Sequence, residues 1–249
     1  MNKIVSIDNV GKKYNTTNGE IEAIKSITFD VKEGEFVALV GSSGCGKSTL
    51  LSIMAGLDKQ SVGNVNYYID KPVIGYMLQE DALLAHYTIL DNILLGLKIK
   101  NKLNDKSKEY AINLLKKYNL DKFIDKKPHE LSGGMKQRVS LIRTLAIKPD
   151  ILFLDEPFSA LDFSTRLKVS DDVYKIIKKE RKTTIMVTHD IGEAISMADK
   201  VIVLSKSPAK VKSVYNIELI NKEFPTQNRK DEKFNYYYDL IWRDLDKDE

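Results

Sequence analysis

A glycine-rich segment, GSSGCGKST at positions 41–49, has residue types suited to holding a chain of phosphates. Gly41 is followed after four residues by Gly46, Lys47 and Ser48, which is the spacing of a P-loop. Glycines let several backbone N–H groups converge on an anion, the lysine adds a cation, and the hydroxyl can bind Mg²⁺. We therefore expect this segment to bind ATP and Mg²⁺. The expected nucleotide-binding residues are Gly41, Ser42, Ser43, Gly44, Cys45, Gly46, Lys47, Ser48 and Thr49.

The residues on either side of this segment fit the same interpretation. The apolar run FVALV at 36–40 predicts a buried strand, and TLLSIMAGL at 49–57 has a helical pattern. The start of that helix would add its own positive end to the anion site. A glycine-rich turn without a ligand is the alternative, and the Lys-Ser pair between a strand and a helix argues against it.

A second segment, ILFLDE at 151–156, brings two carboxylates to the end of an apolar strand. Ligands of open α/β sheets bind at the carboxyl ends of strands. Asp155 is then placed to hold Mg²⁺, and Glu156 to polarise the water that attacks the γ-phosphate. Taken alone, the pattern more often marks a strand that runs into a loop, so its meaning depends on the P-loop upstream.

A third segment, LSGGMKQR at 131–138, predicts a helix with an accessible start. Ser132 can cap that helix, and Gly133 and Gly134 leave its N–H groups open to an anion. A plain helix cap is the alternative for this segment alone. The three segments in this order resemble the ATP-binding cassette (ABC) ATPases, of which LSGGMKQR is the signature. The resemblance covers about residues 3–215.

The resemblance implies roles for four further residues. Gln79, after VIGYM at 73–77, resembles the glutamine that senses Mg²⁺ and the attacking water, although an isolated glutamine is ordinarily a surface residue. Asp162 resembles the aspartate that communicates between two ATP sites, with helix capping as its alternative. His189 follows the apolar run TTIMV and resembles the histidine that contacts the γ-phosphate. Tyr14 resembles the aromatic residue that stacks on adenine, although the chain has 12 tyrosines and chance placement is easy.

In this family neither ATP site is complete within one chain, because the signature of one subunit faces the P-loop of the other. The resemblance therefore implies a head-to-tail dimer that clamps two ATP molecules and is released by hydrolysis. The sequence has no internal repeat and no room for a second nucleotide site. The dimer must come from two chains, either identical or related.

Composition limits where such a protein acts. The 249 residues are 43% hydrophobic, and no apolar run approaches the roughly 18 residues of a membrane span. The first ten residues lack the apolar core of a signal peptide, and the single cysteine, Cys45, lies inside the P-loop. We expect a cytosolic protein without disulfides. The net charge of +4 is mild and spread along the chain, so nucleic acid is not an expected partner.

The order of patterns predicts an α/β fold with a P-loop core and a mainly parallel sheet. Strands at 4–10 and 27–31 indicate an antiparallel β layer, and helical spacing at 111–120 and 139–147 indicates a helical subdomain over about 82–147. We expect the ATPase domain to cover 1–220, and 221–249 to form a connector and an amphipathic helix. That helix would pack onto its own domain or, alternatively, onto a partner or membrane. Its apolar stripe is Phe234, Tyr237, Tyr238, Ile241, Trp242 and Leu245.

The segment at 80–100 is where transporter members of the family receive a short helix of the membrane subunit. A groove there or plain core packing would both explain its apolar residues, which are Leu83, Leu84, Ile89, Ile93 and Leu94. The sequence further resembles the nitrate, sulfonate and taurine importer ATPases. Met135 in the signature matches that subgroup, whereas Ala85 and His86 replace its common Pro-Trp pair.

These observations favour an ATP-hydrolysing transporter subunit at the cytoplasmic face of the membrane. Its expected partners are integral-membrane permease subunits, a second ATPase chain and an external solute-binding protein. A soluble ABC ATPase acting on DNA or ribosomes is the alternative, but such relatives usually have a coiled-coil insert or two cassettes. A binding module without turnover is a third possibility, which the presence of Lys47, Glu156 and His189 disfavours.

Overall fold

The structure is a computed structural model that describes residues 2–17, 19–220 and 222–246. The chain divides into two compact units. The first unit comprises residues 1–72 and 182–249, and the second comprises residues 73–181. Each unit contains some of the expected site residues.

Parallel strands form the centre of the first unit. Strand β3 (Phe36–Val40) pairs in parallel with β7 (Thr183–Val187) on one side and with β8 (Lys200–Leu204) on the other. Every residue of β3 and β7 is buried. Parallel strands covered on both faces are apolar without alternation, which explains why the runs FVALV and TTIMV predict these strands correctly.

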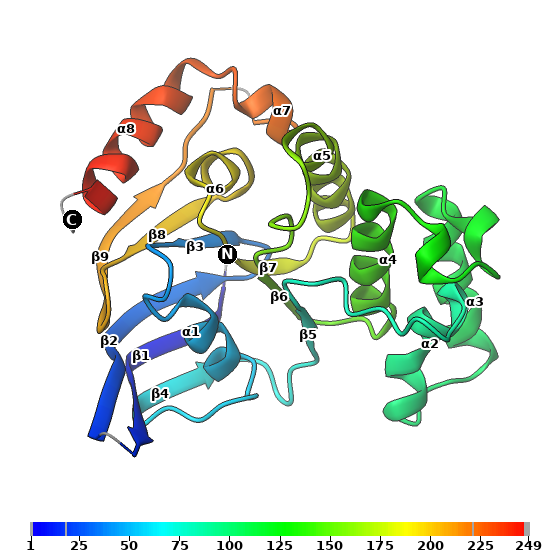
Figure 1. Cartoon of the computed structure of the whole chain (residues 1–249), viewed down its shortest axis with the longest axis horizontal. Coiled ribbons are helices and arrows are strands. Elements are labelled where there is room, and N and C mark those ends of the chain that lie inside the picture. Colours follow the sequence, from blue (N-terminus) through cyan, green and yellow to red (C-terminus); the bar gives the residue numbers. More distant parts are fainter. Residues whose placement is uncertain (1, 18, 221, 247–249) are drawn as a thin grey trace. The chain divides into compact units, whose positions relative to one another are not determined.

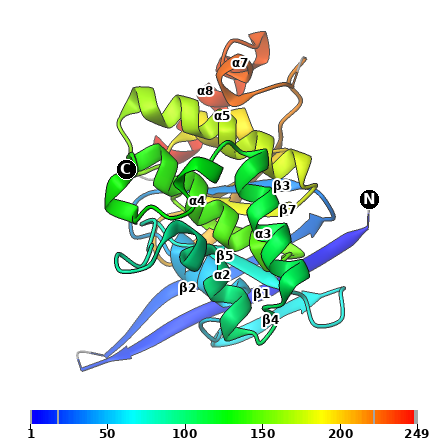
Figure 2. The same cartoon turned by 90° about the vertical axis from the view of Figure 1, so that its right-hand side faces the viewer.

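The antiparallel strands of the first unit continue the same sheet, in the order β4-β1-β2-β9-β8-β3-β7. Long strands β1 (Lys3–Thr16) and β2 (Gly19–Lys32) form an antiparallel pair, and β4 (Val62–Tyr67) adds to β1. Figure 2 shows β1 and β2 side by side. Strand β9 (Ala209–Asn216) is antiparallel to β8 and parallel to β2. The predicted antiparallel part therefore exists, and β9 joins it to the parallel strands.

The helices of the first unit are α1 (Lys47–Met54), α6 (Ile191–Met197), α7 (Pro225–Asn228) and α8 (Glu232–Asp246). Helix α1 begins two residues before the predicted start and ends three before the predicted end. The predicted terminal helix is confirmed as α8, which packs against α6, β8 and β9 (Figure 1). Its apolar stripe is only partly covered, since Phe234 and Ile241 are buried while Tyr238 and Trp242 are exposed.

The second unit combines two strands with a group of helices. Strands β5 (Ile74–Met77) and β6 (Ile151–Asp155) pair in parallel, so that Met77 lies opposite Leu154. The predicted helical region contains α2 (Ile89–Ile99), α3 (Asp105–Lys117) and α4 (Gly133–Ala146), with short 3₁₀ turns at Asp121–Phe123 and Pro128–Glu130. Helix α4 packs against α2 and α3, and also against α5 (Phe163–Lys179) (Figure 2).

For most of the apolar residues at 80–100, the structure favours core packing over a groove. Ile89, Ile93 and Leu94 of α2 are buried, whereas Leu84, in the preceding loop, is 42% exposed. The buried side chain of Asn92 holds that loop, because it accepts a hydrogen bond from the Leu84 amide at 2.7 Å and donates one to the Leu84 carbonyl at 3.1 Å. Leu84 is thus exposed on a loop that is hydrogen-bonded to Asn92.

Candidate nucleotide site

The P-loop of the first unit connects β3 to α1, as the sequence predicts. Gly44 (φ 74°) and Gly46 (φ 109°) adopt left-handed backbone conformations that side chains other than glycine rarely tolerate. Lys47 is 5% exposed, and its Nζ donates to the carbonyls of Gly41 (2.8 Å) and Ser42 (2.9 Å). The ammonium group is therefore held against the loop that carries the backbone donors, while the side chain of Ser48 is exposed.

Cys45 is part of the packing beneath the loop and is buried. Burial raises the pKa of its thiol, because a thiolate would lose its hydration there. A Cβ atom on Gly41 would lie 2.8 Å from the Cys45 sulfur, so this part of the loop has no space for a larger residue. The cysteine thus serves as a small buried side chain.

Tyr14 lies on β1, with its ring partly exposed and fixed by two neighbours. Its hydroxyl donates to the Asp58 carboxylate at 3.1 Å, and Nζ of Lys12 lies 4.8 Å from the ring centroid. Lys12 also pairs with Asp58 at 2.6 Å, and this hydrogen bond is the main reason why the pKa of Asp58 is lowered. The sequence pattern did not indicate that Lys12 and Asp58 orient the ring. A ring held in one position is suited to stacking on a flat base.

His189 follows β7 and lies at the same cavity as the beginning of the P-loop. The cavity has a volume of about 370 Å³. It is lined by Gly41, Ser42, Ser43, His189, Lys206, Trp242, Leu245 and Asp246. The structure therefore brings His189 and the P-loop together, as expected.

Lys206 and Asp246 were not predicted to belong to this site. Lys206 follows β8, which runs parallel to β3, so its place after a neighbouring strand was a usable signal. Asp246 and Trp242 come from α8, and the sequence has no pattern that places a terminal helix beside a P-loop.

The acidic end of β6 lies in the second unit. Asp155 is 9% exposed, and its Oδ2 accepts a hydrogen bond from the Tyr76 hydroxyl at 3.1 Å. Tyr76 comes from the neighbouring strand β5. This contact fixes one carboxylate oxygen in position, and it was not foreseen because it depends on the pairing of two strands distant in the sequence.

Glu156 has an unusual backbone conformation for a glutamate, with φ 43°. Such strained conformations persist only where the surroundings hold them, and they concentrate at functional sites. Here the amide and hydroxyl of Ser159 both donate to the Glu156 carbonyl, at 3.2 and 3.0 Å. The Glu156 carboxylate lies 3.5 Å from the side-chain nitrogen of Gln79, so the structure brings these two candidates together.

The signature segment begins α4 as predicted. Ser132 caps the helix by accepting a hydrogen bond from the Met135 amide at 3.4 Å. Gly133 begins the helix, and Gly134 has a further, structural reason to lack a side chain. A Cβ atom on Gly134 would lie 2.6 Å from a methyl group of Val169 on α5. One signature glycine thus permits close helix packing in addition to leaving the helix start accessible.

Asp162 caps α5. Helix capping is the alternative to its role in communication between two ATP sites. Its carboxylate accepts hydrogen bonds from the Thr165 amide at 3.0 Å and the Ser164 hydroxyl at 2.8 Å. The bonds from Thr165, followed by that from Ser164, hold the pKa of Asp162 well below its usual range. The carboxylate is therefore ionised at neutral pH and available to a partner as an anion.

The candidate metal ligands are hard oxygen donors. Ser48 supplies a hydroxyl in the first unit, and Asp155 and Gln79 supply a carboxylate and an amide oxygen in the second. Mg²⁺ prefers such ligands and usually retains several waters. Each of these residue types is therefore one that Mg²⁺ accepts as a ligand.

Comparison with known proteins places the chain in a family. The sequence model of the ABC transporter family matches residues 24–159. An uncharacterized ABC transporter ATP-binding protein of Bacillus subtilis, YtlC, is 42% identical over 96% of this chain and 94% of its own length. The aliphatic sulfonates import ATP-binding protein SsuB of Bacillus cereus is 39% identical over 86% of each chain. The nitrate transport protein NasD of Klebsiella oxytoca is 36% identical over 84% of this chain and 83% of its own length.

Solved structures agree with these relatives. The ATP-binding cassette MJ0796, determined as a dimer in a post-hydrolysis state bound to ADP and Pi, has a TM-score of 0.73 and 33% identity. That comparison covers 86% of this chain and 99% of the other. Among residues 2–17, 19–220 and 222–246, no helix is long and apolar enough to cross a membrane. The family model and the relatives show that the chain belongs to the ABC transporter ATP-binding proteins, and it is an ATPase.

Proposed function

We propose that this chain is the ATP-hydrolysing subunit of an importer for a small solute, acting at the cytoplasmic face of a membrane through separate permease subunits. The observation that carries this proposal is the similarity, over more than four-fifths of the chain, to the sulfonate and nitrate proteins. The complete set of ATPase motifs supports turnover rather than nucleotide binding alone.

The roles of individual residues follow from their chemistry. The P-loop at 41–49 binds the phosphates, with the Lys47 ammonium moving from its own loop carbonyls onto the phosphate oxygens. Glu156 acts as the general base, and Gln79 and His189 orient the water and the γ-phosphate. Ser48, Gln79 and Asp155 would hold Mg²⁺, and the ion would neutralise phosphate charge there. Tyr14 stacks on adenine.

A second ATPase chain completes each site. The start of α4 offers backbone N–H groups to an anion, with Ser132, Gly133 and Gly134 as its first contacts, and Asp162 communicates with the other site. The dimeric state of the compared cassettes supports this arrangement. The partner is an identical chain or a related ATPase.

The cargo is an anion or a zwitterion of low molecular mass, such as nitrate, an aliphatic sulfonate or taurine. Support comes from the names of the similar proteins, which refer to sulfonates, nitrate and also bicarbonate. An external solute-binding protein delivers such a solute to the permease. The cargo does not touch this chain, so its identity must be tested on the assembled complex.

Affinity purification of the tagged chain from native membranes in mild detergent, followed by mass spectrometry, tests this proposal. A membrane permease recovered in near-equal amount supports it, and candidate solutes can then be tested for stimulation of ATPase activity in reconstituted vesicles. Recovery of ribosomal proteins or DNA-bound proteins from a soluble fraction, without a permease, would instead support action on nucleic acid or ribosomes.

A further inference from the structure

The terminal helix α8 forms one wall of the cavity at the beginning of the P-loop. Gly41, Ser42 and Ser43 line that cavity together with His189, and the last turns of α8 contribute Trp242, Leu245 and Asp246. All these residues belong to the first unit. The end of α8 therefore borders the same cavity as the first three residues of the P-loop.

Several contacts fix the last turns of α8 in this position. The Asp244 carboxylate accepts hydrogen bonds from the Tyr215 hydroxyl at 2.6 Å and from the Ser213 hydroxyl, while Lys212 donates to the Asp244 carbonyl. These three partners lie on β9. Ile241, one turn earlier, is fully buried. The seat of α8 is thus built from both polar and apolar contacts.

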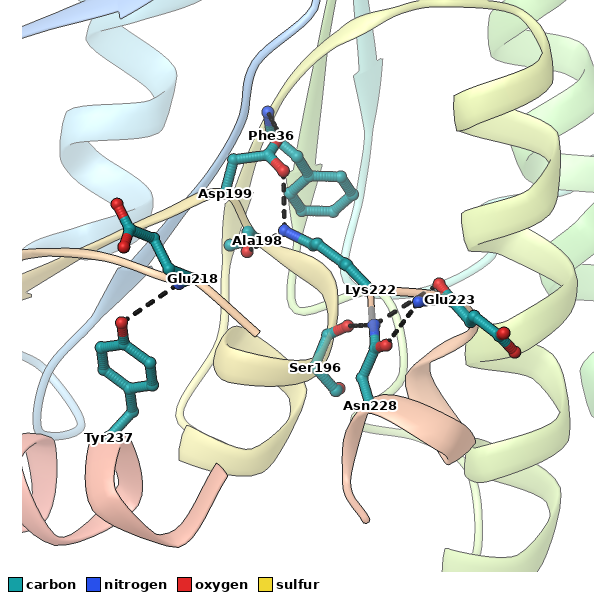
Figure 3. Close-up of polar contacts among 9 residues, drawn as sticks. All are labelled: Phe36, Ser196, Ala198, Asp199, Glu218, Lys222, Glu223, Asn228 and Tyr237. Carbon is teal, nitrogen blue, oxygen red and sulfur yellow. Dashed lines mark hydrogen bonds and ion pairs between the residues drawn. The ribbon is translucent and has the colours of Figure 1, made fainter. Parts of the chain in front are cut away.

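The segment that leads into α8 is anchored as well (Figure 3). Nζ of Lys222 donates to the Ala198 carbonyl and pairs with Asp199, both at 2.6 Å. Farther along, the Tyr237 hydroxyl accepts a hydrogen bond from the Glu218 amide at 3.1 Å. Because these anchors precede the last turns of α8, they can persist when the last turns move.

The end of α8 is negatively charged, as ATP is, so the two repel each other. The C-terminal end of a helix has a partial negative charge, and Asp246 adds a carboxylate at the same cavity. The P-loop beside it has the opposite preference, because its N–H groups and Lys47 attract anions. A phosphate chain that enters this cavity meets the repulsion of the helix end and of Asp246.

We propose that the end of α8 is an autoinhibitory element that opposes ATP binding, and that ATP displaces it from the cavity. This inference rests on the proposed nucleotide site. By linkage, release of α8 strengthens ATP binding by the same factor by which bound ATP favours release of α8. The transporter subunit would then bind ATP most tightly when α8 is released.

Fluorescence of Trp242 reports on the end of α8 and on this cavity, because this residue lines the cavity and is the single tryptophan of the chain. Its ring stacks on Tyr238 with an interplanar angle of 10° and is 54% exposed. Displacement of the last turns should change the ring's surroundings. We expect a saturable change in emission on titration of the full-length protein with ATP and Mg²⁺, and we expect Trp242→Phe to remove the signal.

Asp246→Asn tests the electrostatic part of the proposal. Removal of this charge should lower the Kd for ATP, measured by equilibrium dialysis, by about two- to fivefold at low salt, and the effect should shrink at high salt. Asp239→Asn is the matched control, since Asp239 is an exposed acid of α8 outside the cavity. Asp244→Asn, which weakens the seat on β9, should also lower the Kd.

The proposal requires both the change in Trp242 emission and the lower Kd of Asp246→Asn. It is overturned if Trp242 emission stays constant while dialysis shows ATP binding, or if Asp246→Asn binds ATP with the affinity of the unaltered protein. Lys47→Ala tests the proposed nucleotide site separately from the role of α8. ATP binding that does not depend on Lys47 would contradict the proposed nucleotide site itself, independently of α8.

Discussion

The side-chain nitrogen Nδ2 of Asn228 donates a hydrogen bond of 2.7 Å to the carbonyl of Ser196, at the end of α6 (Figure 3). Its Oδ1 accepts a second bond of 2.7 Å from the Glu223 amide. Asn228 is completely buried, and its bond to Ser196 is buried as well. A single amide side chain thereby ties the C-terminal segment to the sheet-and-helix core of the first unit.

Loss of this amide should destabilise the protein. Asn228→Ala leaves the Ser196 carbonyl and the Glu223 amide without these partners inside the protein, which should lower the free energy of unfolding by about 1–3 kcal/mol. Urea denaturation followed by circular dichroism measures the change. Asn235→Ala, at an exposed position of α8, is the control and should change stability by less than about 0.5 kcal/mol. Equal losses for the two variants would contradict the anchoring role of Asn228.

Cys45 should be protected from alkylation in the folded protein. Burial both covers the sulfur and raises its pKa, so the reactive thiolate is scarcer at pH 7–8 than in the unfolded chain, and its fraction rises only as pH passes the ordinary thiol value of about 8.5. Mass spectrometry after iodoacetamide treatment, with and without guanidinium, measures this directly because the chain has one cysteine. Rapid modification of the native protein at neutral pH would refute the buried assignment.

Ser132→Arg should prevent the second ATPase chain from closing on the nucleotide. A long cation at the start of α4 would obstruct the N–H groups that we assign to the other subunit's ATP, so cooperative ATPase activity should be lost while ATP still binds the P-loop. Ser132→Ala serves as the comparison, because it removes the cap of α4 without adding bulk, at about 1 kcal/mol of stability. Undiminished cooperativity in Ser132→Arg would rule out the shared site.

Features that depend on local sequence were predictable. The runs at 36–40, 151–155 and 183–187 are mostly apolar without alternation and buried throughout, as is typical of buried parallel strands. The P-loop and the cap by Ser132 follow from residue types at fixed spacing. Resemblance to the family then provided Gln79, which the structure places beside Glu156.

Features that depend on tertiary packing were not predictable. The helical spacing of Ile89, Ile93 and Leu94 fits both a groove and a core, and only the packing of α2 against α4 decides for core. In the same way, the stripe on α8 did not reveal which residues are covered. The place of Trp242 at the P-loop cavity results from the path of the chain after β9, which no local pattern encodes.

The most direct test of the account is the ATPase activity of Glu156→Gln, measured together with ATP binding. If Glu156 is the general base, steady turnover should fall by about a hundred- to ten-thousand-fold, while the affinity for ATP stays within a few-fold of the unaltered protein. Glu109→Gln, at an exposed position of α3, controls for the loss of a carboxylate in the same unit. Full turnover in Glu156→Gln would contradict the proposed mechanism, and lost turnover with retained binding would support it.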